Sequence, residues 1–248
     1  MNSFEKAPIL LLEEVASTNT YLLDLLNEKK IEEGTIVNAK HQSAGRGMGN
    51  NIWISEIGKN ATFSIVLFPD FTAVEEQFLI TQLISLSVLN WVKSRLPGKN
   101  CVIKWPNDIL VEGKKICGIL AQSSILGNKL QYVVAGIGIN LNQKDFGTLN
   151  SLATSIINQS GNISEIEESI YEIRKEIYKQ YQILTSGKTE VLQKKYLDAL
   201  HLLNENHIFS DAEGHFTGKI CGVNRFGQLQ ITDTTGRIRI YNTKEVVY

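Results

Sequence analysis

The stretch KWPNDILVEGKKICGIL, residues 104–120, places polar residues within an otherwise strand-like segment. Asn107 and Asp108 precede one apolar run, and Lys115 follows the turn signal that separates this run from the next. A hairpin would return Lys115 toward Asn107 and Asp108. The pattern indicates either a surface hairpin with an exposed salt bridge or the charged wall of a site. The wall is favoured because Trp105-Pro106 is unusual at an exposed edge and functional residues concentrate at strand breaks.

The segments around this hairpin predict a sheet interleaved with helices. Apolar alternation predicts strands over residues 9–14, 35–40, 61–68, 101–105, 108–111, 116–123 and 130–140. Ser17 is expected to cap an amphipathic helix. Capping-box patterns, Thr72 with Glu75 and Ser164 with Glu167, are expected to begin two longer helices.

The pattern of predicted secondary structure changes near His201. Short alternating strands follow, broken by the turn signals Glu213-Gly214, Phe226-Gly227 and Thr235-Gly236. Turns at such short intervals predict a small barrel of the SH3-like kind. The sequence therefore predicts an α+β main domain over residues 1–200 and a β domain over residues 201–248.

Composition excludes several classes of function. The 248 residues are 43% hydrophobic and 21% charged, with a formal net charge of −1. The chain therefore lacks the overall positive charge that binding to a nucleic-acid backbone requires. No apolar run approaches the roughly 20 residues of a membrane span. The cysteines Cys101, Cys117 and Cys221 are odd in number and widely spaced, which predicts buried free thiols and a cytoplasmic location.

Two glycine-rich stretches are further site candidates. In QSAGRGMGNNIW, residues 42–53, glycines alternate around Arg46 and Met48, so backbone N–H groups could face an anion; the alternative is a flexible solvent loop. In AGIGINLN, residues 135–142, Gly136 and Gly138 weaken a strand unless a ligand or another backbone comes close. A β-bulge is the alternative for that second stretch.

Other chemistries lack their motifs. The four histidines have no metal-like spacing, and there is no nucleophile elbow or phosphate loop. An amide and a carboxylate such as Asn107 and Asp108 can hold a magnesium ion or a ribose, and Lys115 can neutralise developing negative charge. Such a set favours adenylyl chemistry over hydrolysis.

Taken together and in this order, the stretches resemble the biotin–protein ligases. The matching residues are Ser17-Thr18-Asn19, Gln42, Gly45-Arg46-Gly47, Trp53, Lys104-Trp105-Pro106-Asn107-Asp108, Lys115, Gly118 and Gly136-Ile137-Gly138-Ile139-Asn140. The resemblance implies a class II aminoacyl-tRNA-synthetase-like catalytic domain, with a mixed sheet flanked by helices, and a small C-terminal SH3-like β-barrel. It also implies an enzyme that joins biotin to ATP, with Mg²⁺, and then transfers biotin to a lysine of a biotin carboxyl carrier protein.

The resemblance assigns roles to individual residues. Lys115 and Arg46 would be catalytic, and Asp108 would meet the magnesium ion. Biotin would contact Ser17, Thr18, Asn19, Gln42, Gly45, Arg46, Lys115, Gly118 and Gly136. ATP would contact Arg46, Trp53, Asn107, Asp108, Lys115 and Asn140.

The chain departs from the family pattern in two places. The catalytic pattern begins within the first twenty residues, so the helix-turn-helix domain of the repressor-type ligases is not expected, nor is a nucleic-acid partner. The loop reads GRGMGNNIW where much of the family reads GRGRRGR, which leaves Arg46 as its single arginine and predicts faster escape of the adenylate.

Two rival functions and the oligomeric state stay open at this point. A lipoate–protein ligase or octanoyltransferase would share the fold, although Ser17, Thr18, Gln42 and the β tail favour biotin. A non-catalytic SH3-like binding module would leave Lys115 and Asp108 without a use. Monomer and homodimer are both compatible with the sequence.

Overall fold

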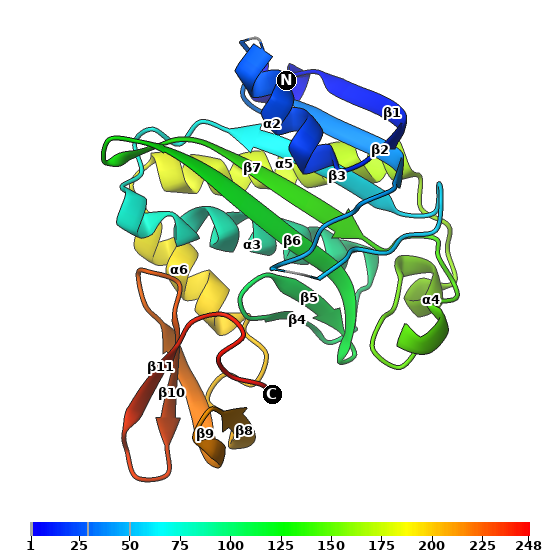
Figure 1. The fold of residues 1–248 in the computed structure, drawn as a ribbon. Coiled ribbons are helices and arrows are strands. Elements are labelled where there is room, and N and C mark those ends of the chain that lie inside the picture. The colour runs from blue at the N-terminus through cyan, green and yellow to red at the C-terminus, as the bar shows by residue number, and fades with distance from the viewer. Residues whose placement is uncertain (1, 29, 50) are drawn as a thin grey trace.

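The protein is described by a computed structural model that covers residues 2–28, 30–49 and 51–248. Its centre is a seven-stranded mixed sheet in the order β1-β2-β3-β7-β6-β5-β4 (Figure 1). The strands are β1 (Ile9–Val15), β2 (Ile36–Gln42), β3 (Ala61–Leu67), β4 (Cys101–Lys104), β5 (Asp108–Val111), β6 (Lys114–Leu126) and β7 (Lys129–Ile139). β1 and β2 are parallel, and every other neighbouring pair is antiparallel. The seven predicted strands and the mixed sheet are confirmed.

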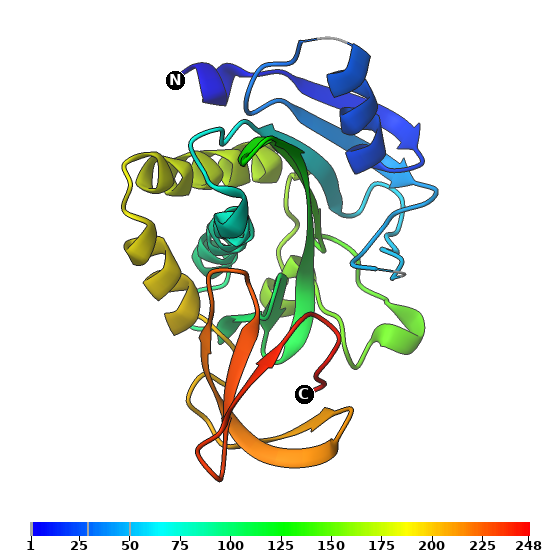
Figure 2. The same cartoon turned by 60° about the vertical axis from the view of Figure 1, so that its left-hand side comes forward.

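Helices cover both faces of this sheet (Figures 1 and 2). One face packs against α3 (Phe78–Arg95) and α5 (Ile166–Thr185), and the other against α2 (Thr18–Glu28). The helix α6 (Thr189–Asp198) packs against α3 and α5. Strand alternation separates the two cores: Ile36 belongs to the larger core on the α3 side, and Val37 packs with Leu22 of α2. The short elements α1 (Ser3–Lys6), η1 (Val74–Glu76), η2 (Gly147–Leu149) and α4 (Ile156–Ser160) complete this region.

Both predicted capping boxes are wrong. α3 begins at Phe78 after the 3-10 turn η1, and the hydroxyl of Thr72 is buried without a partner among the described residues. α5 begins at Ile166 without a side-chain cap, because the backbone of Ser164 instead exchanges hydrogen bonds with the Asn142 side chain at 2.8 and 2.9 Å. Tertiary packing overrides the local capping signal at both positions. The predicted position of Ser17 ahead of α2 is confirmed, and its carbonyl accepts from the Tyr21 N–H at 3.0 Å.

The C-terminal residues form a separate antiparallel sheet in the order β11-β10-β9-β8. Its strands are β8 (His207–Asp211), β9 (Gly214–Val223), β10 (Leu229–Asp233) and β11 (Ile238–Tyr241). Gly214, Gly227 and Gly236, the glycines of the predicted turn signals, all have positive φ; Gly227 and Gly236 lie in turns between strands, and Gly214 is the first residue of β9. The chain after β11 returns to the opposite edge strand, β8, where Val247 forms a β-bridge with Ser210.

The C-terminal sheet is anchored on the edge strand of the large one (Figure 2). The indole N–H of Trp105 donates to the Gly227 carbonyl at 2.9 Å, and Lys104 Nζ donates to the Tyr248 carbonyl at 2.8 Å. The β4 edge itself is covered where Ile103 pairs with Leu200. Trp105 is therefore buried, which answers why a tryptophan follows this edge strand.

One cysteine prediction is wrong. Cys101 and Cys117 are buried free thiols, but the free thiol of Cys221 is exposed. Cys221 lies in β9 between Ile220 and Gly222, which face inward, so alternation turns its side chain outward. Across the described residues, no helix combines the length and hydropathy that a bilayer crossing requires.

Candidate functional site

A pocket opens on the face of the large sheet that carries α2, next to the C-terminal sheet. Its cavity volume is about 190 Å³. It is lined by Ser17, Thr18, Asn19, Gln42, Arg46, Gly47, Met48, Asn51, Ile52, Trp53, Phe63, Lys104–Asp108, Lys115, Gly118–Leu120, Gly136–Gly138, Thr243 and Lys244. Residues from three predicted motifs, far apart in sequence, thus meet in one place.

Glycines on the strands hollow out the floor of the pocket. Gly118 of β6 pairs with Asp108 on one side and Gly138 of β7 on the other, so all three lie on the same face. A Cβ on Gly138 would come within 2.3 Å of the Trp53 ring, and one on Gly136 within 2.4 Å of Asn19 Oδ1. The close approach predicted for these glycines is made by the side chains of Trp53 and Asn19, where the sequence predicted a ligand or another backbone. The bulge that was the alternative for residues 135–142 is absent from the β6–β7 and β3–β7 register there.

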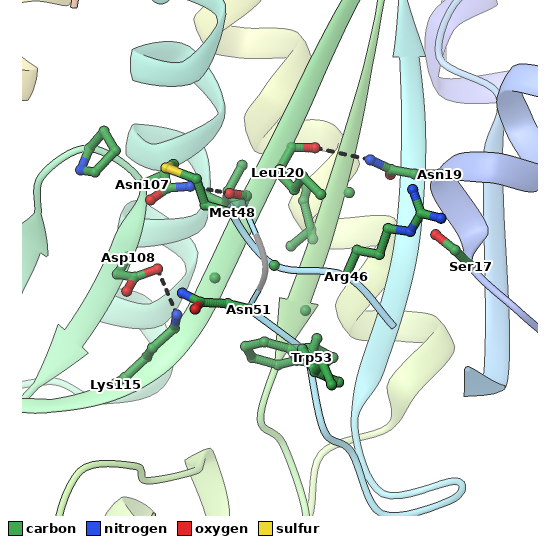
Figure 3. A pocket seen from close by; sticks show the side chains of 18 of the residues that line it. Ser17, Asn19, Arg46, Met48, Asn51, Trp53, Asn107, Asp108, Lys115 and Leu120 are labelled. Atoms are coloured by element: carbon green, nitrogen blue, oxygen red, sulfur yellow. Dashed lines mark hydrogen bonds and ion pairs between the residues drawn. The ribbon is translucent and has the colours of Figure 1, made fainter. Parts of the chain in front are cut away.

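A β-bulge places Lys115 beside Asp108. The β5–β6 register shifts between Ile109 and Leu110, so that Lys115 pairs with Leu110. Cross-strand partners share a face, and Leu110 lies on the face of Asp108, two residues away. Without the bulge Lys115 would point to the opposite face. The predicted approach is confirmed by a 2.8 Å contact between Lys115 Nζ and Asp108 Oδ1 (Figure 3).

This ion pair is still open to solvent and to a ligand. The Lys115 side chain is 38% exposed and that of Asp108 28%. Lys115 Nζ lies 5.7 Å from the centre of the Trp53 ring, so an aromatic face adjoins the ammonium group. Asn107 is buried beside the pair; its amide NH₂ donates to the Ile119 carbonyl, and its Oδ1 has no partner among the described residues. The cluster therefore presents a cation, a carboxylate and an amide oxygen to one cavity.

Polar side chains at the start of α2 form the other end of the pocket. Thr18 donates to Gln42 Oε1 from its N–H at 2.8 Å and from its hydroxyl at 3.1 Å. Ser64 Oγ lies 2.7 Å from Thr18 Oγ1 and 2.6 Å from Asn19 Oδ1. Because the oxygen of Gln42 is held in this way, its NH₂ group has no partner within the described parts of the chain. The Ser17 hydroxyl likewise faces the pocket without one.

Asn19 positions its neighbours. Its NH₂ donates to the Leu120 carbonyl at 3.2 Å and to Gln122 Oε1 at 2.8 Å, and its oxygen accepts from Ser64. Every hydrogen-bonding group of the amide is engaged, and the residue is buried. Asn19 thus ties the start of α2 to strands β3 and β6.

The glycine-rich segment forms a narrow hairpin over the pocket. The Trp53 N–H donates to the Gly45 carbonyl at 3.0 Å, and the Gly47 N–H donates to the Asn51 carbonyl at 2.8 Å. The prediction that successive N–H groups of this loop face an anion is thus wrong at Gly47, whose N–H is used within the hairpin. Asn50, in the same loop, lies outside the described residues. Trp53 lies over Gly138, and its buried indole N–H has no partner among the described residues.

Two predicted site residues lie outside the pocket lining. Asn140 is buried at the end of β7, where its NH₂ donates to the Thr154 carbonyl at 2.9 Å, so the amide is not presented to the pocket. Gly45 is a buried residue of the hairpin itself, where a Cβ would come within 2.7 Å of the Trp53 carbonyl oxygen. Thr243 and Lys244 line the pocket and were not predicted, because nothing in the local sequence links the chain end to a site some hundred residues away.

The described lining is positively charged. It carries Arg46, Lys104, Lys115 and Lys244 but Asp108 as its one carboxylate, whereas the whole chain has a net charge of −1. Figure 3 shows Arg46 reaching toward the side where Ser17 lies, and Lys115 with Asp108 on the opposite side. The described residues contain no group of three or more histidine, cysteine or acidic side chains able to hold a metal ion. A cation-rich pocket with uncommitted donors at one end fits an anionic ligand with a polar head.

Comparison with known proteins agrees with this geometry. The sequence model of the Biotin/lipoate A/B protein ligase family matches residues 11–140. The bifunctional ligase/repressor BirA of Bacillus spizizenii is 32% identical over 238 residues, covering 94% of this chain and 72% of that protein. The biotin–[acetyl-CoA-carboxylase] ligase of Paracoccus denitrificans is 35% identical over 136 residues, covering 52% of this chain and 55% of that protein.

A solved structure extends the comparison over nearly the whole chain. The biotin protein ligase from Aquifex aeolicus, solved in complex with biotin and ATP, superimposes with a TM-score of 0.79 at 25% identity and covers 97% of both chains. The match includes the C-terminal sheet as well as the large one. From its sequence and its fold, the chain belongs to the biotin/lipoate A/B protein ligase family.

Proposed function

We propose that this ligase is an ATP-dependent biotin–protein ligase. It would first form biotinyl-5′-adenylate from biotin and ATP, and then transfer biotin to a lysine of a biotin carboxyl carrier protein. The observation that carries the proposal is the polarity of the pocket. Uncommitted hydrogen-bonding groups gather at the Ser17 end, and Lys115 and Lys104 lie at the other end beside Asp108.

The Ser17 end suits the ureido ring of biotin. That ring presents two N–H donors and one carbonyl acceptor, and the pocket offers the Ser17 hydroxyl and the free NH₂ of Gln42. Thr18 and Asn19 hold this arrangement in place through Gln42 and Ser64. Both are therefore proposed as positioning residues. Gly118 and Gly136 shape the adjoining floor by admitting Lys115 and Asn19.

The Lys115 end suits the reacting groups. A carboxylate oxygen of biotin would attack the α-phosphorus of ATP, the bond to the β-phosphate would break, and pyrophosphate would leave. Two anions must meet for this step, and their repulsion is strong in a site that excludes water. The Lys115 ammonium would bridge carboxylate and phosphoryl oxygens, with Arg46 on the other side of the reacting carboxylate. Both are proposed as catalytic residues.

Trp53 and Asn107 would place the nucleotide. Trp53 covers the floor at Gly138, and its unpartnered indole N–H can be satisfied by an acceptor on a bound molecule. Asn107 offers a free amide oxygen toward the pocket. Asn140 would act on the nucleotide only through its hold on the Thr154 segment.

A magnesium ion fits this site only together with the nucleotide. Mg²⁺ commonly binds through one or two carboxylates plus substrate phosphates and water, and Asp108 is the single carboxylate of the described lining. We propose Asp108 as the ligand that the protein provides. The ion would neutralise charge on the phosphates, while Asp108 also holds Lys115 in the pocket.

The remaining parts of the proposal concern organisation. We propose residues 1–200 as the catalytic domain and residues 201–248 as the C-terminal β domain, supported by the change of sheet after α6. A cytoplasmic location is supported by three free cysteines. The carrier protein is supported by the acetyl-CoA-carboxylase named for the Paracoccus denitrificans relative. No nucleic-acid partner is proposed, and the oligomer would be a monomer or a homodimer.

A pyrophosphate-release assay tests the proposed function. Purified protein with ATP and Mg²⁺ is given biotin, lipoate or octanoate in parallel, and a carrier domain is added in a second step. Biotin-dependent release followed by biotinylation of the carrier is expected. Release with lipoate or octanoate alone would assign the chain to that branch of the family. No release with any of the three acids would support the binding-module alternative.

A further inference from the structure

The turn after β11 holds a lysine in a conformation that favours glycine. The Glu245 N–H donates to the Asn242 carbonyl at 3.1 Å, which closes a turn over residues 242–245. Lys244, its third residue, has φ +73°, one of four positive φ values among the described non-glycine residues. Glycine is the usual residue at such a position. A retained backbone outlier of this kind points to a role for the side chain that occupies it.

The carboxylate next to Lys244 is committed elsewhere. Glu245 accepts from the Asn242 N–H at 2.6 Å and from the Asn242 side-chain NH₂ at 3.1 Å. These hydrogen bonds lower the pKa of the Glu245 carboxyl, whose two oxygens are both engaged by Asn242. Lys244 is exposed and forms no ion pair or hydrogen bond with the described residues. Its ammonium is therefore available to an external anion.

Lys244 reaches the glycine-rich hairpin across the mouth of the pocket. A Cβ on Gly49 would lie 2.5 Å from Lys244 Nζ, so the ammonium packs directly against the hairpin backbone. Thr243 and Lys244 line the main pocket, and Thr243 also lines an adjoining cleft with Met48 and Asn107. Figure 3 shows Met48, the neighbour of Gly49, beside Asn107 and on the side of Asp108 and Lys115.

This position matches a gap in the charge of the hairpin. Its single arginine, Arg46, reaches toward Ser17 and leaves the Asp108 side without a cation from the hairpin. Lys115 is on that side, but it is paired with Asp108. A triphosphate carries several negative charges and would need a further unpaired cation there.

We infer that Lys244 binds the phosphate groups of ATP and then of the acyl-adenylate. It would supply, from the segment after β11, a cation beside the glycine-rich hairpin. The inference rests on the proposed function and adds a specific nucleotide-binding residue to it. It also explains how an arginine-poor hairpin retains an anion, since the second charge comes from a different part of the chain. Small-molecule acids without phosphate would not use this contact.

Three substitutions separate the charge of Lys244 from its backbone. Lys244→Met removes the charge and keeps the strained turn, Lys244→Gly removes both, and Lys244→Arg keeps the charge. Lys219→Met, on the exposed side of β9, serves as a matched control that removes a lysine from the same sheet. The measurements are the KM for ATP in biotin-dependent pyrophosphate release, the rate of adenylate dissociation, and the Kd for biotin without ATP.

Loss of one charge-assisted contact is expected to raise the KM for ATP about tenfold in both the Met and the Gly variants. Adenylate dissociation should quicken by a similar factor, and the Kd for biotin should not change. The Arg variant should stay close to wild type, as should Lys219→Met. Because Lys244→Met keeps the strained turn and Lys244→Gly relieves it, an effect caused by the backbone alone would appear in the Gly variant and be absent from the Met variant.

The outcomes distinguish the role of Lys244 from the proposed function. Active wild type with an unchanged KM and dissociation rate in Lys244→Met overturns the inference about Lys244 and leaves the proposed function standing. Failure of Lys244→Arg to preserve the KM would also count against it. Wild type without biotin-dependent release, but with intact fold by circular dichroism, overturns the proposed function itself.

Discussion

The pocket and the C-terminal sheet each contain a charge cluster. Cations outnumber carboxylates in the pocket, and carboxylates outnumber cations on the C-terminal sheet. At the pocket, four cations share one described carboxylate. On the C-terminal sheet, the single guanidinium of Arg239 contacts Asp211 at 3.0 Å, Asp233 at 3.1 Å and Glu213 at 3.2 Å. The carboxylates Asp211 and Asp233 receive further hydrogen bonds from Tyr241 and Thr235, at 2.6 Å each.

The difference separates a structural cluster from a functional one. Around Arg239 every charge meets an internal partner, so the cluster holds strands together and has little left to offer a ligand. At the pocket, Arg46 and Lys244 have no ion pair with the described residues, and Gln42 and Trp53 keep free donors. Uncommitted groups of this kind lower stability slightly, and they are retained where a ligand satisfies them. Substitutions in the two clusters should therefore affect different properties.

The largest effect is expected from Lys115→Ala. Removing one preorganised charge from a reacting centre costs roughly 3 to 4 kcal/mol of barrier, so biotin-dependent pyrophosphate release should fall by a factor of about 10² to 10³. Thermal stability should change little, because the Lys115 side chain is over a third exposed. Lys114→Ala is the matched control, because the Lys114 ammonium hydrogen-bonds only to the Asn150 carbonyl among the described residues. Equal turnover in the two variants would remove Lys115 from the reaction.

Gly138→Ala should give the next largest loss. The added methyl group would lie 2.3 Å from the Trp53 ring and would displace the indole from the pocket floor. We expect activity to fall about tenfold, on the order of one lost nucleotide contact. Gly222→Ala in β9 is the comparison, since its methyl group meets only the flexible end of Gln230 at 2.8 Å. Steady-state kinetics of both variants decides the point, and similar losses would argue against a role for the Trp53 position.

Arg239→Met should act on stability and leave chemistry intact. The substitution leaves Asp211 and Asp233 close together without their cation, so the melting temperature should fall by several degrees. Arg237→Met, at an exposed position in the turn between β10 and β11, should have little effect. Once each protein is folded, turnover measured well below its melting temperature should match wild type. Loss of turnover without loss of stability would contradict the division between the clusters.

The same cluster predicts how stability depends on pH. Hydrogen bonds, chiefly from the Thr235 hydroxyl and then from Arg239, lower the pKa of Asp233 to about 2. A carboxyl group with a lowered pKa contributes stability that is fully present above its unfolded value near 4. That contribution should be lost as the pH falls from about 4 toward 2. Urea unfolding of wild type and Arg239→Met across this range should show the smaller pH dependence in the variant.

The smallest effect concerns the joint between the two regions. Trp105→Phe removes the hydrogen bond to the Gly227 carbonyl and should lower the free energy of unfolding by about 1 to 2 kcal/mol. Hydrogen exchange should quicken in the turn around Gly227 more than in β3. Trp91→Phe loses a comparable hydrogen bond, to Glu172, within the helical layer, and should leave that turn unaffected. Equal protection of the turn in both variants would show that the joint does not depend on Trp105.

The strands of the large sheet and the hairpin of Lys115 were predictable, because apolar alternation and turn residues act over a few positions. The approach of Lys115 to Asp108 followed from the Glu112-Gly113 turn, where both residues have positive φ. The helix starts near Thr72 and Ser164 were mispredicted, because Asn142 and the packing of α3 compete with the local caps. Local sequence patterns therefore predict a helix start correctly only where no distant residue forms a competing hydrogen bond or packing contact.

The pocket required the folded arrangement. The register shift after Ile109 determines on which face of the sheet the Lys115 side chain lies, and no local sequence pattern predicts a shift of one residue. Gly136 and Gly138 are visible in the sequence, but only packing shows that they admit Asn19 and Trp53. Lys244 reaches Gly49 across almost two hundred residues of chain. Contacts over such separations depend on how the layers of the fold pack, so the residue pattern alone did not show the shared pocket, which only the family resemblance implied.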